Sequence, residues 1–168
     1  MPRLYTKQRK RFDCGPVTII NALKWAGKNI TYEKRINYFK RLCKCDDIDG
    51  TKHRNFDRAL RISGKDMFSI RRVHHPTLKE IVNHLKNKNA IVINYRWRKR
   101  KSNRNMRHFI LLVGIEPSKD SFDVVNGYGK GPALQPVLRE QFKRLELRFQ
   151  RVDKHYKAWF LTKLKGGK

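Results

Sequence analysis

A cysteine at the mouth of a predicted helix is the feature that most constrains how this chain folds. Cys14 is followed by Gly15, by Pro16 and by an apolar run over residues 17–23. Proline is favoured in the first turn of a helix, where its missing N–H leaves no hydrogen bond unmade. A helix is therefore expected over residues 16–26. The partial positive charge of a helix N-terminus favours a thiolate, so the sequence predicts an activated thiol at this position.

A side-chain amide stands close upstream of the thiol. Gln8 precedes Cys14 by a short basic segment and is placed to donate an N–H to an oxyanion that develops beside the sulfur. The pair alone is only suggestive, because a lone cysteine before an apolar helix is more often a small core residue. The rest of the chain decides between these two interpretations.

The back half of the chain supplies a candidate base. A cysteine nucleophile needs a base, and the base needs an orienting group. His108 opens an apolar run over residues 109–115, and the return strand over 121–125 ends at Asn126. The five residues 116–120 between these strands read as a turn. A histidine and an asparagine are thus expected at the same end of one hairpin.

The register of that hairpin decides which residues meet. If Ile115 pairs with Ser121, Asn126 lies diagonal to His108 on the same face of the sheet, within reach of its imidazole. Asp123 stands at an odd offset along the return strand and is expected to face the other way. Asn126 is therefore preferred over Asp123 as the orienting residue.

Helical patterns dominate the front half of the chain and strand-like runs the back half. This order predicts an α+β fold in which an N-terminal helical half packs on a C-terminal antiparallel sheet. Thr77 and Glu80 form a capping box, and Gly64 is expected to close the third helix. The predicted helices cover residues 16–26, 32–42, 53–62, 78–86 and 138–147. The predicted strands cover residues 67–71, 91–95, 109–115, 122–125 and 158–162.

These residues resemble the papain-like cysteine peptidases, specifically the C39-like branch, the bacteriocin-processing peptidases. That family shows Gln-x5-Cys-Gly near the start, a His that opens an apolar strand, and Asp or Asn after the next strand. The resemblance extends to Gly50-Thr51 before a helix, to Thr77-Leu-Lys-Glu80 before the strand at 90–94, and to the closing Ala158-Trp-Phe-Leu161. One departure is Asn126-Gly127, where the family often has Asp-Pro.

The resemblance implies a papain-like fold and a thiol-dependent peptidase. It makes Cys14 the nucleophile, His108 the general base and acid, Asn126 the orienter and Gln8 the oxyanion donor. It covers roughly residues 4–161, which fits a single domain over residues 1–168 with a core of about 4–162. A peptide or protein substrate is implied, and no cofactor is needed. An idle papain-like fold that serves only as a binding module remains the alternative.

The charge of the chain suggests a polyanionic partner. Its 168 residues hold 41 Lys and Arg against 14 acids, a formal net charge of +27. Such an excess is too large for ordinary surface solvation, which mixes both signs. Sequence-independent binding of nucleic acid through phosphate neutralisation is favoured, with an acidic peptide as the other polyanion. The candidate nucleic-acid-binding residues are Arg9, Lys10, Arg11, Arg96, Arg98, Lys99, Arg100, Lys101, Arg104 and Arg107.

The expected cellular location of the protein follows from the membrane, export and disulfide signals that are not found in its sequence. No apolar run approaches the ~18 residues of a spanning helix, and the N-terminus has no apolar signal-peptide core. Three cysteines do not form a disulfide framework, which favours a reducing interior, cytoplasmic or virion-associated, without a membrane partner. Cys43, Cys45 and His53 are metal-ligand types, but Cys-x-Cys is not a usual zinc spacing, and no metal is expected.

Overall fold

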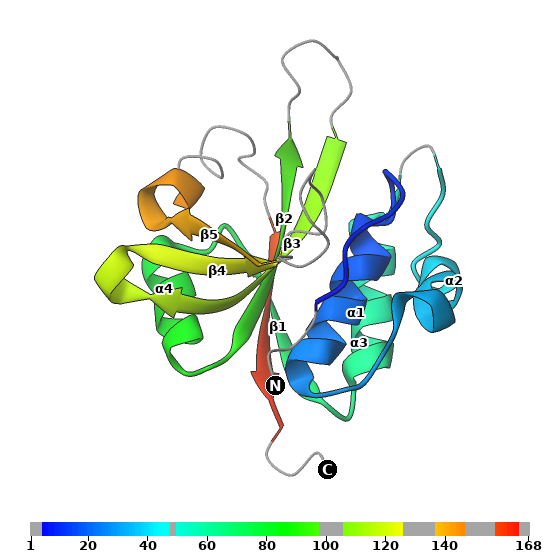
Figure 1. Ribbon diagram of the computed structural model, residues 1–168, viewed down its shortest axis with the longest axis horizontal. Coiled ribbons are helices and arrows are strands. Elements are labelled where there is room, and N and C mark those ends of the chain that lie inside the picture. The colour runs from blue at the N-terminus through cyan, green and yellow to red at the C-terminus, as the bar shows by residue number, and fades with distance from the viewer. Residues whose placement is uncertain (1–4, 48–49, 98–105, 126–136, 147–156, 165–168) are drawn as a thin grey trace.

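A six-stranded antiparallel sheet runs through the centre of the computed structural model, with helices on both of its faces (Figure 1). The structure describes residues 5–47, 50–97, 106–125, 137–146 and 157–164. The helices are α1 (Cys14–Ala26), α2 (Tyr32–Leu42), α3 (His53–Gly64) and α4 (Leu78–Lys86), with a 3-10 turn η1 at Pro117–Lys119. None of the helices within these ranges combines the length and apolar character that crossing a membrane requires.

The strands follow an order in the sheet that differs from their order in the chain. They are β1 (Phe68–His74), β2 (Ala90–Trp97), β3 (Met106–Glu116), β4 (Ser121–Val125), β5 (Val137–Gln141) and β6 (Lys157–Lys163). Their order across the sheet is β1-β6-β2-β3-β4-β5. The last strand thus inserts between β1 and β2, which places both next to a strand far away in sequence.

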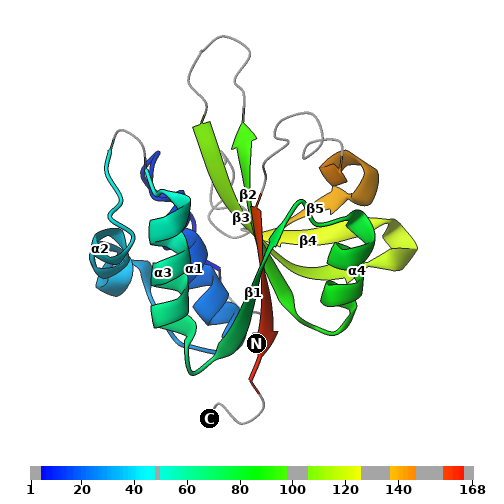
Figure 2. The ribbon, with the colours of Figure 1, turned by 180° about the vertical axis from the view of Figure 1, so that it is seen from behind.

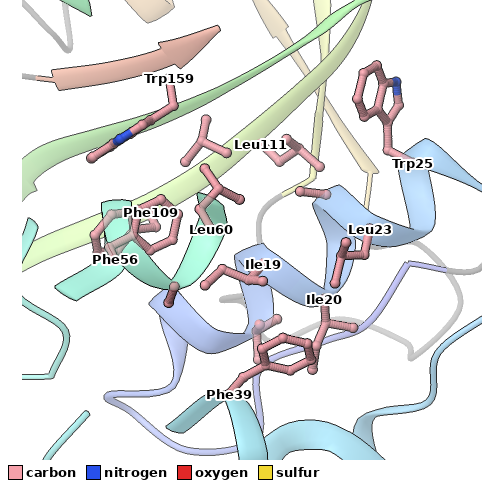
Figure 3. Packing of buried hydrophobic residues seen from close by; sticks show 14 of the residues in the cluster. Ile19, Ile20, Leu23, Trp25, Phe39, Phe56, Leu60, Phe109, Leu111 and Trp159 are labelled. Atoms are coloured by element: carbon pink, nitrogen blue, oxygen red, sulfur yellow. The ribbon is translucent and has the colours of Figure 1, made fainter. Parts of the chain in front are cut away.

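Alternating side chains divide the core into two layers, one on each face of the sheet. One layer packs α1 and α3 against the sheet, with α2 on the outer side of these two helices. Figure 3 shows Phe56 of α3 beside Phe109 of β3 and close to Trp159 of β6. The rings of Phe56 and Phe109 stack with centroids 4.1 Å apart. The other layer packs α4 against the opposite face through Ile81 and Leu85. The predicted α+β arrangement of helices on an antiparallel sheet is confirmed.

Most predicted elements lie where the sequence placed them, but one is wrong. Residues 138–147 were expected to be helical, whereas Val137–Gln141 forms β5 and only residues 142–146 are helical. The segment has good helix formers, but Val137–Gln141 pairs with β4 over its whole length. Ladder hydrogen bonds to a neighbouring strand outweigh a helix preference of a few tenths of a kcal/mol per residue, roughly.

The hairpin register is correct at one end and wrong at the other. Near the turn Ile115 pairs with Phe122 rather than Ser121, because Glu116 extends β3 and η1 shortens the connection. The register then shifts between Leu112 and Gly114, and beyond this bulge Leu111 pairs with Val125 as expected. A bulge adds one residue to one strand, so it restores the alignment at the end of the hairpin that leads to His108.

Two local expectations about helix ends have different outcomes. Thr77 and Glu80 make the predicted capping box, with the Thr77 hydroxyl accepting from the Glu80 N–H and the Glu80 carboxylate accepting from the Thr77 N–H. Gly64 is the last residue of α3, but Lys65 after it still has helical angles. A Cβ on Gly64 would lie 2.2 Å from the Phe68 ring. Gly64 is needed for this close approach and not for a left-handed cap.

Candidate active site

Cys14 is the first residue of α1 and lies against the start of β3. Its side chain is 8% exposed and belongs to the α1-side core layer. Burial raises the pKa of the Cys14 thiol to about 11, although hydrogen bonds from the main chain of Phe109, Gly15 and Cys14 itself act in the opposite direction. Burial therefore acts against the thiolate that the sequence predicts at the helix N-terminus. Desolvation outweighs the local amide groups.

A close approach between two main-chain segments sets the position of α1. A Cβ on Gly15 would lie 2.7 Å from Thr51 Oγ1 and 2.8 Å from Thr51 Cβ. Thr51 is itself buried. The glycine after the cysteine is required because the segment leading into α3 occupies the space of its side chain. Gly15 and Thr51 were both part of the sequence motif, and the structure supplies the contact that links them.

The other two cysteines lie on the segment after α2. Cys43 is fully buried, and burial raises its pKa well above the ordinary range. Cys45 is half-buried; its thiol donates to the carbonyl of Phe12 at 3.2 Å, and desolvation raises its pKa. Within the described ranges, no three His, Cys, Asp or Glu side chains gather in a way that could hold a metal ion.

Asp13 anchors the segment that carries the thiol, a role that sequence reasoning missed. Its side chain is only 1% exposed. It accepts a hydrogen bond of 2.9 Å from the Tyr32 hydroxyl and lies 3.1 Å from Lys40 Nζ. Partial burial, together with the bond to Asp13, raises the pKa of Tyr32 to about 12. The carboxylate thus ties the start of α1 to α2, and an aspartate directly before the cysteine was the available signal.

Gln8 lies beside the same segment, with its amide donors already in use. Its Nε2 donates to the carbonyls of Lys10 and Arg11 at 2.6 and 2.7 Å. These bonds shape the loop that leads into Asp13 and Cys14. An amide NH2 has two protons, so donation to an oxyanion requires one of these bonds to be exchanged.

His108 lies at the start of β3 with its side chain largely buried. It pairs across the sheet with Tyr95 of β2, and the two rings meet edge-on with centroids 6.0 Å apart. Alternation puts the His108 ring on the Tyr95 side of the sheet and Phe109 on the α1 side. Thr18 of α1 donates to the Phe109 carbonyl at 3.4 Å. The structure therefore brings Cys14 to the main chain of Phe109, the residue after His108, while the His108 ring projects from the other face of β3.

Asn94 and His53 form a buried polar pair next to the His108 main chain, and sequence reasoning did not identify this pair. Asn94 is fully buried on β2, and its Nδ2 donates to the His108 carbonyl at 3.2 Å. Its Oδ1 faces Nε2 of His53, the first residue of α3. The His53 ring lies edge-on to Phe109 at 6.3 Å. An asparagine inside an otherwise apolar strand was the signal, because a buried amide needs partners.

Asn126 and Asp123 are the two candidates for the residue that orients His108. Asn126 lies outside the described residues, so its distance from His108 remains a prediction. Asp123 lies opposite Gly114, with Oδ1 3.5 Å from Arg139 Nε. Its carboxylate is therefore engaged near the turn of the hairpin, six positions along β3 from His108.

The candidate nucleic-acid-binding cations are only partly described. Residues 98–105 lie outside the described ranges, and Arg96 and Arg107 are described only as opposing main-chain positions of β2 and β3. Arg9 pairs with Glu33 and covers the Tyr32 ring at 4.6 Å. Lys10 and Arg11 are exposed, and the Arg11 guanidinium lies 5.4 Å from the centre of the Phe12 ring.

Comparison with known proteins identifies the fold. The sequence matches no protein-family model, and no curated protein matches it either. The peptidase domain of Streptococcus ComA, a bifunctional ABC transporter involved in quorum sensing, is similar in structure with a TM-score of 0.66 and 17% identity; the similarity covers 95% of this chain and 98% of that domain. A Bacillus anthracis protein assigned as a C39-like peptidase is similar with a TM-score of 0.65 and 10% identity, over 99% and 96% of the two chains. The predicted papain-like fold is thereby confirmed, and this chain has the fold of the C39 peptidase domains.

Proposed function

We propose that this chain is a cysteine peptidase with Cys14 as nucleophile and His108 as general base and acid. The observation that carries the proposal is the position of Cys14, at the start of α1 and against the main chain of Phe109, the residue after His108. The shared fold with C39 peptidase domains supports the assignment. A peptide or protein is the substrate.

The raised thiol pKa shapes the first step of the proposed reaction. Because burial holds the Cys14 pKa near 11, the thiol gives its proton to the His108 imidazole as Sγ attacks the substrate carbonyl carbon. The C–S bond forms and the carbonyl π electrons move to oxygen. The imidazolium then protonates the amine as the C–N bond breaks, which leaves a thioester that water hydrolyses with His108 as base.

The remaining catalytic roles follow the same proposal. The Cys14 N–H and the Gln8 amide stabilise the oxyanion, once substrate takes the place of one loop carbonyl at Gln8 Nε2. Asn126 holds the imidazole in the orientation for proton transfer. Asn94 positions the main chain of His108, because its Nδ2 donates a hydrogen bond to the His108 carbonyl.

The net charge of +27 supports a second element of the proposal, work on or near nucleic acid. A setting such as a virion or nucleoid would neutralise the self-repulsion of so many cations. The rival function is an idle papain-like fold that binds or packages nucleic acid, and the same net charge of +27 supports it.

Labelling with a papain-class epoxide inhibitor, followed by mass spectrometry of the three cysteines, tests the peptidase. We expect covalent addition at Cys14 that Cys14→Ala abolishes and His108→Ala slows at least tenfold. Cys45→Ala is the matched control, because Cys45 is a partly exposed thiol on the neighbouring segment, and its loss should leave the labelling rate unchanged. Equal labelling of Cys14 and Cys45, or a rate indifferent to His108→Ala, would refute the catalytic assignment.

A further inference from the structure

Four exposed basic residues form a single stripe along the outer face of α3. They are Arg54, Arg58, Arg61 and Lys65. Their spacing of four, three and four residues places them on one side of a helix, and the helical angles of Lys65 continue that side past the last turn. The opposite side, with Phe56 and Leu60, is buried in the core. The stripe extends for about 16 Å at the helical rise.

The sheet continues this positive surface. Figure 2 brings α3 to the front beside β1, and Arg61 Nη1 donates to the Ile70 carbonyl of β1 at 3.4 Å. Arg72 of β1 lies close enough to the α3 carboxylate Asp57 to help lower its pKa. At the end of β1, desolvation and the charges of Lys157 and Arg72 lower the pKa of His74, which pairs across the sheet with Lys157. We call Arg54, Arg58, Arg61, Lys65, Arg72 and Lys157 the α3 basic face.

Few acids compensate this charge. Asp57, beside the stripe, accepts from the Trp159 indole at 2.8 Å and from Arg61 Nε at 3.0 Å, so both its oxygens serve the fold. Asp66 follows Lys65 in the chain. Among the residues that the structure describes, Arg54, Arg58 and Lys65 form no ion pair. The surface therefore carries an excess of positive charge that attracts a polyanion.

We propose that the α3 basic face binds the phosphate backbone of duplex nucleic acid without reading its sequence. This inference rests on the nucleic-acid element of the function proposed above and gives it a location. Guanidinium groups suit phosphate oxygens, because they offer a planar pair of donors and are weakly hydrated. Each phosphate that they neutralise releases condensed counterions. The apolar side of α3 is committed to the core, so this helix cannot insert into a lipid surface as an amphipathic anchor does.

The face begins next to the candidate active site. Arg54 follows His53, whose ring contacts Phe109, and Thr51 just before α3 contacts Gly15 beside the nucleophile. A duplex bound along α3 thus runs away from the N-terminal end of α1. Proteins bound to the same nucleic acid would then lie close to Cys14, so the proposal names nucleic-acid-associated proteins as the substrate class.

A pair of charge-matched variants tests the location. Arg54→Gln with Arg58→Gln removes two charges from the stripe, and Gln keeps a good helix former at both positions. The control, Arg35→Gln with Arg41→Gln, removes two exposed arginines from α2 and lowers the net charge equally. Binding of a 20-base-pair DNA duplex of arbitrary sequence is measured by fluorescence anisotropy over a range of salt concentrations. Thermal melts check that both variants are folded.

We expect the stripe variant to flatten the log–log salt dependence by about 1.8, two phosphates at roughly 0.9 each, while the control changes it by less than half as much. Equal changes in both variants would overturn the α3 location but leave nucleic-acid binding in place. No duplex binding by the unmodified protein at low salt would overturn both. If polyglutamate of matched charge binds more tightly than the duplex at the same salt concentration, the partner is an acidic polypeptide and the proposal is wrong. The rate of epoxide labelling of Cys14 in the same variants tests the proposed peptidase site separately, and this rate should not change.

Discussion

Replacing Gly15 by alanine should destabilise the protein although Gly15 lies in a helix. The new Cβ would lie 2.7 Å from Thr51 Oγ1, 2.8 Å from Thr51 Cβ and 3.1 Å from Thr51 Cγ2. Overpacking of this kind costs roughly 1–3 kcal/mol, whereas alanine in place of helical glycine returns roughly 0.5–1 kcal/mol. The net loss is about 1.3 kcal/mol at the middle of these ranges, and about 0–2.5 kcal/mol at their ends, which corresponds to a drop in melting temperature of about 2–4 °C for each kcal/mol.

A double-mutant cycle with Thr51 gives this prediction its sharpest test. In a Thr51→Gly background the clashing atoms are gone, so Gly15→Ala should now stabilise, by roughly 0.5–1 kcal/mol. Thr51→Ala is the intermediate case, because it keeps the Cβ at 2.8 Å and removes only the two outer atoms. Urea denaturation followed by circular dichroism measures all the variants. If Gly15→Ala is neutral or stabilising with Thr51 intact, the close approach of these segments does not determine the position of α1.

Three further predictions concern the site and its surroundings. Asn94→Ala leaves the His108 carbonyl and His53 without their buried partner. Each unsatisfied group costs roughly 1–3 kcal/mol, so urea denaturation should show a total loss of about 2–6 kcal/mol, and a loss below about 1 kcal/mol would contradict the pairing. The raised pKa of Cys14, about 11, favours the protonated folded state, so its contribution is complete below about pH 9 and is lost as the pH rises toward 11. Between pH 8 and pH 11, the free energy of unfolding of Cys14→Ala should therefore fall less steeply than that of the unmodified protein. The difference is roughly 3 kcal/mol at most for two pKa units, and identical slopes for the two proteins would refute the burial argument. Thr77→Ala removes the capping box and should cost about 1 kcal/mol in a thermal melt, against no measurable change for Thr77→Ser.

The sequence predicted most of what depends on near neighbours in the chain. The bounds of α2 and α4 and the capping box follow from patterns a few residues long, in which propensity, cap and apolar period agree. The stripe on α3 is also readable as a basic period, although sequence analysis favoured the cations around residues 96–107 instead. Cys14 at a helix start and His108 at a strand start were likewise local patterns.

Contacts between distant segments required the tertiary structure. Val137–Gln141 became a strand because β4 lies beside it, and the β3 bulge corrected a register that the turn alone had set wrongly. The pKa of Cys14 moved opposite to the helix N-terminal effect, because burial in the core outweighed the amide groups around the sulfur. The Gly15–Thr51 approach and the Asn94–His53 pair join elements that no local pattern connects. Burial and long-range contact depend on which surfaces meet when the whole chain packs, and that choice minimises the free energy of the fold and not of any one segment.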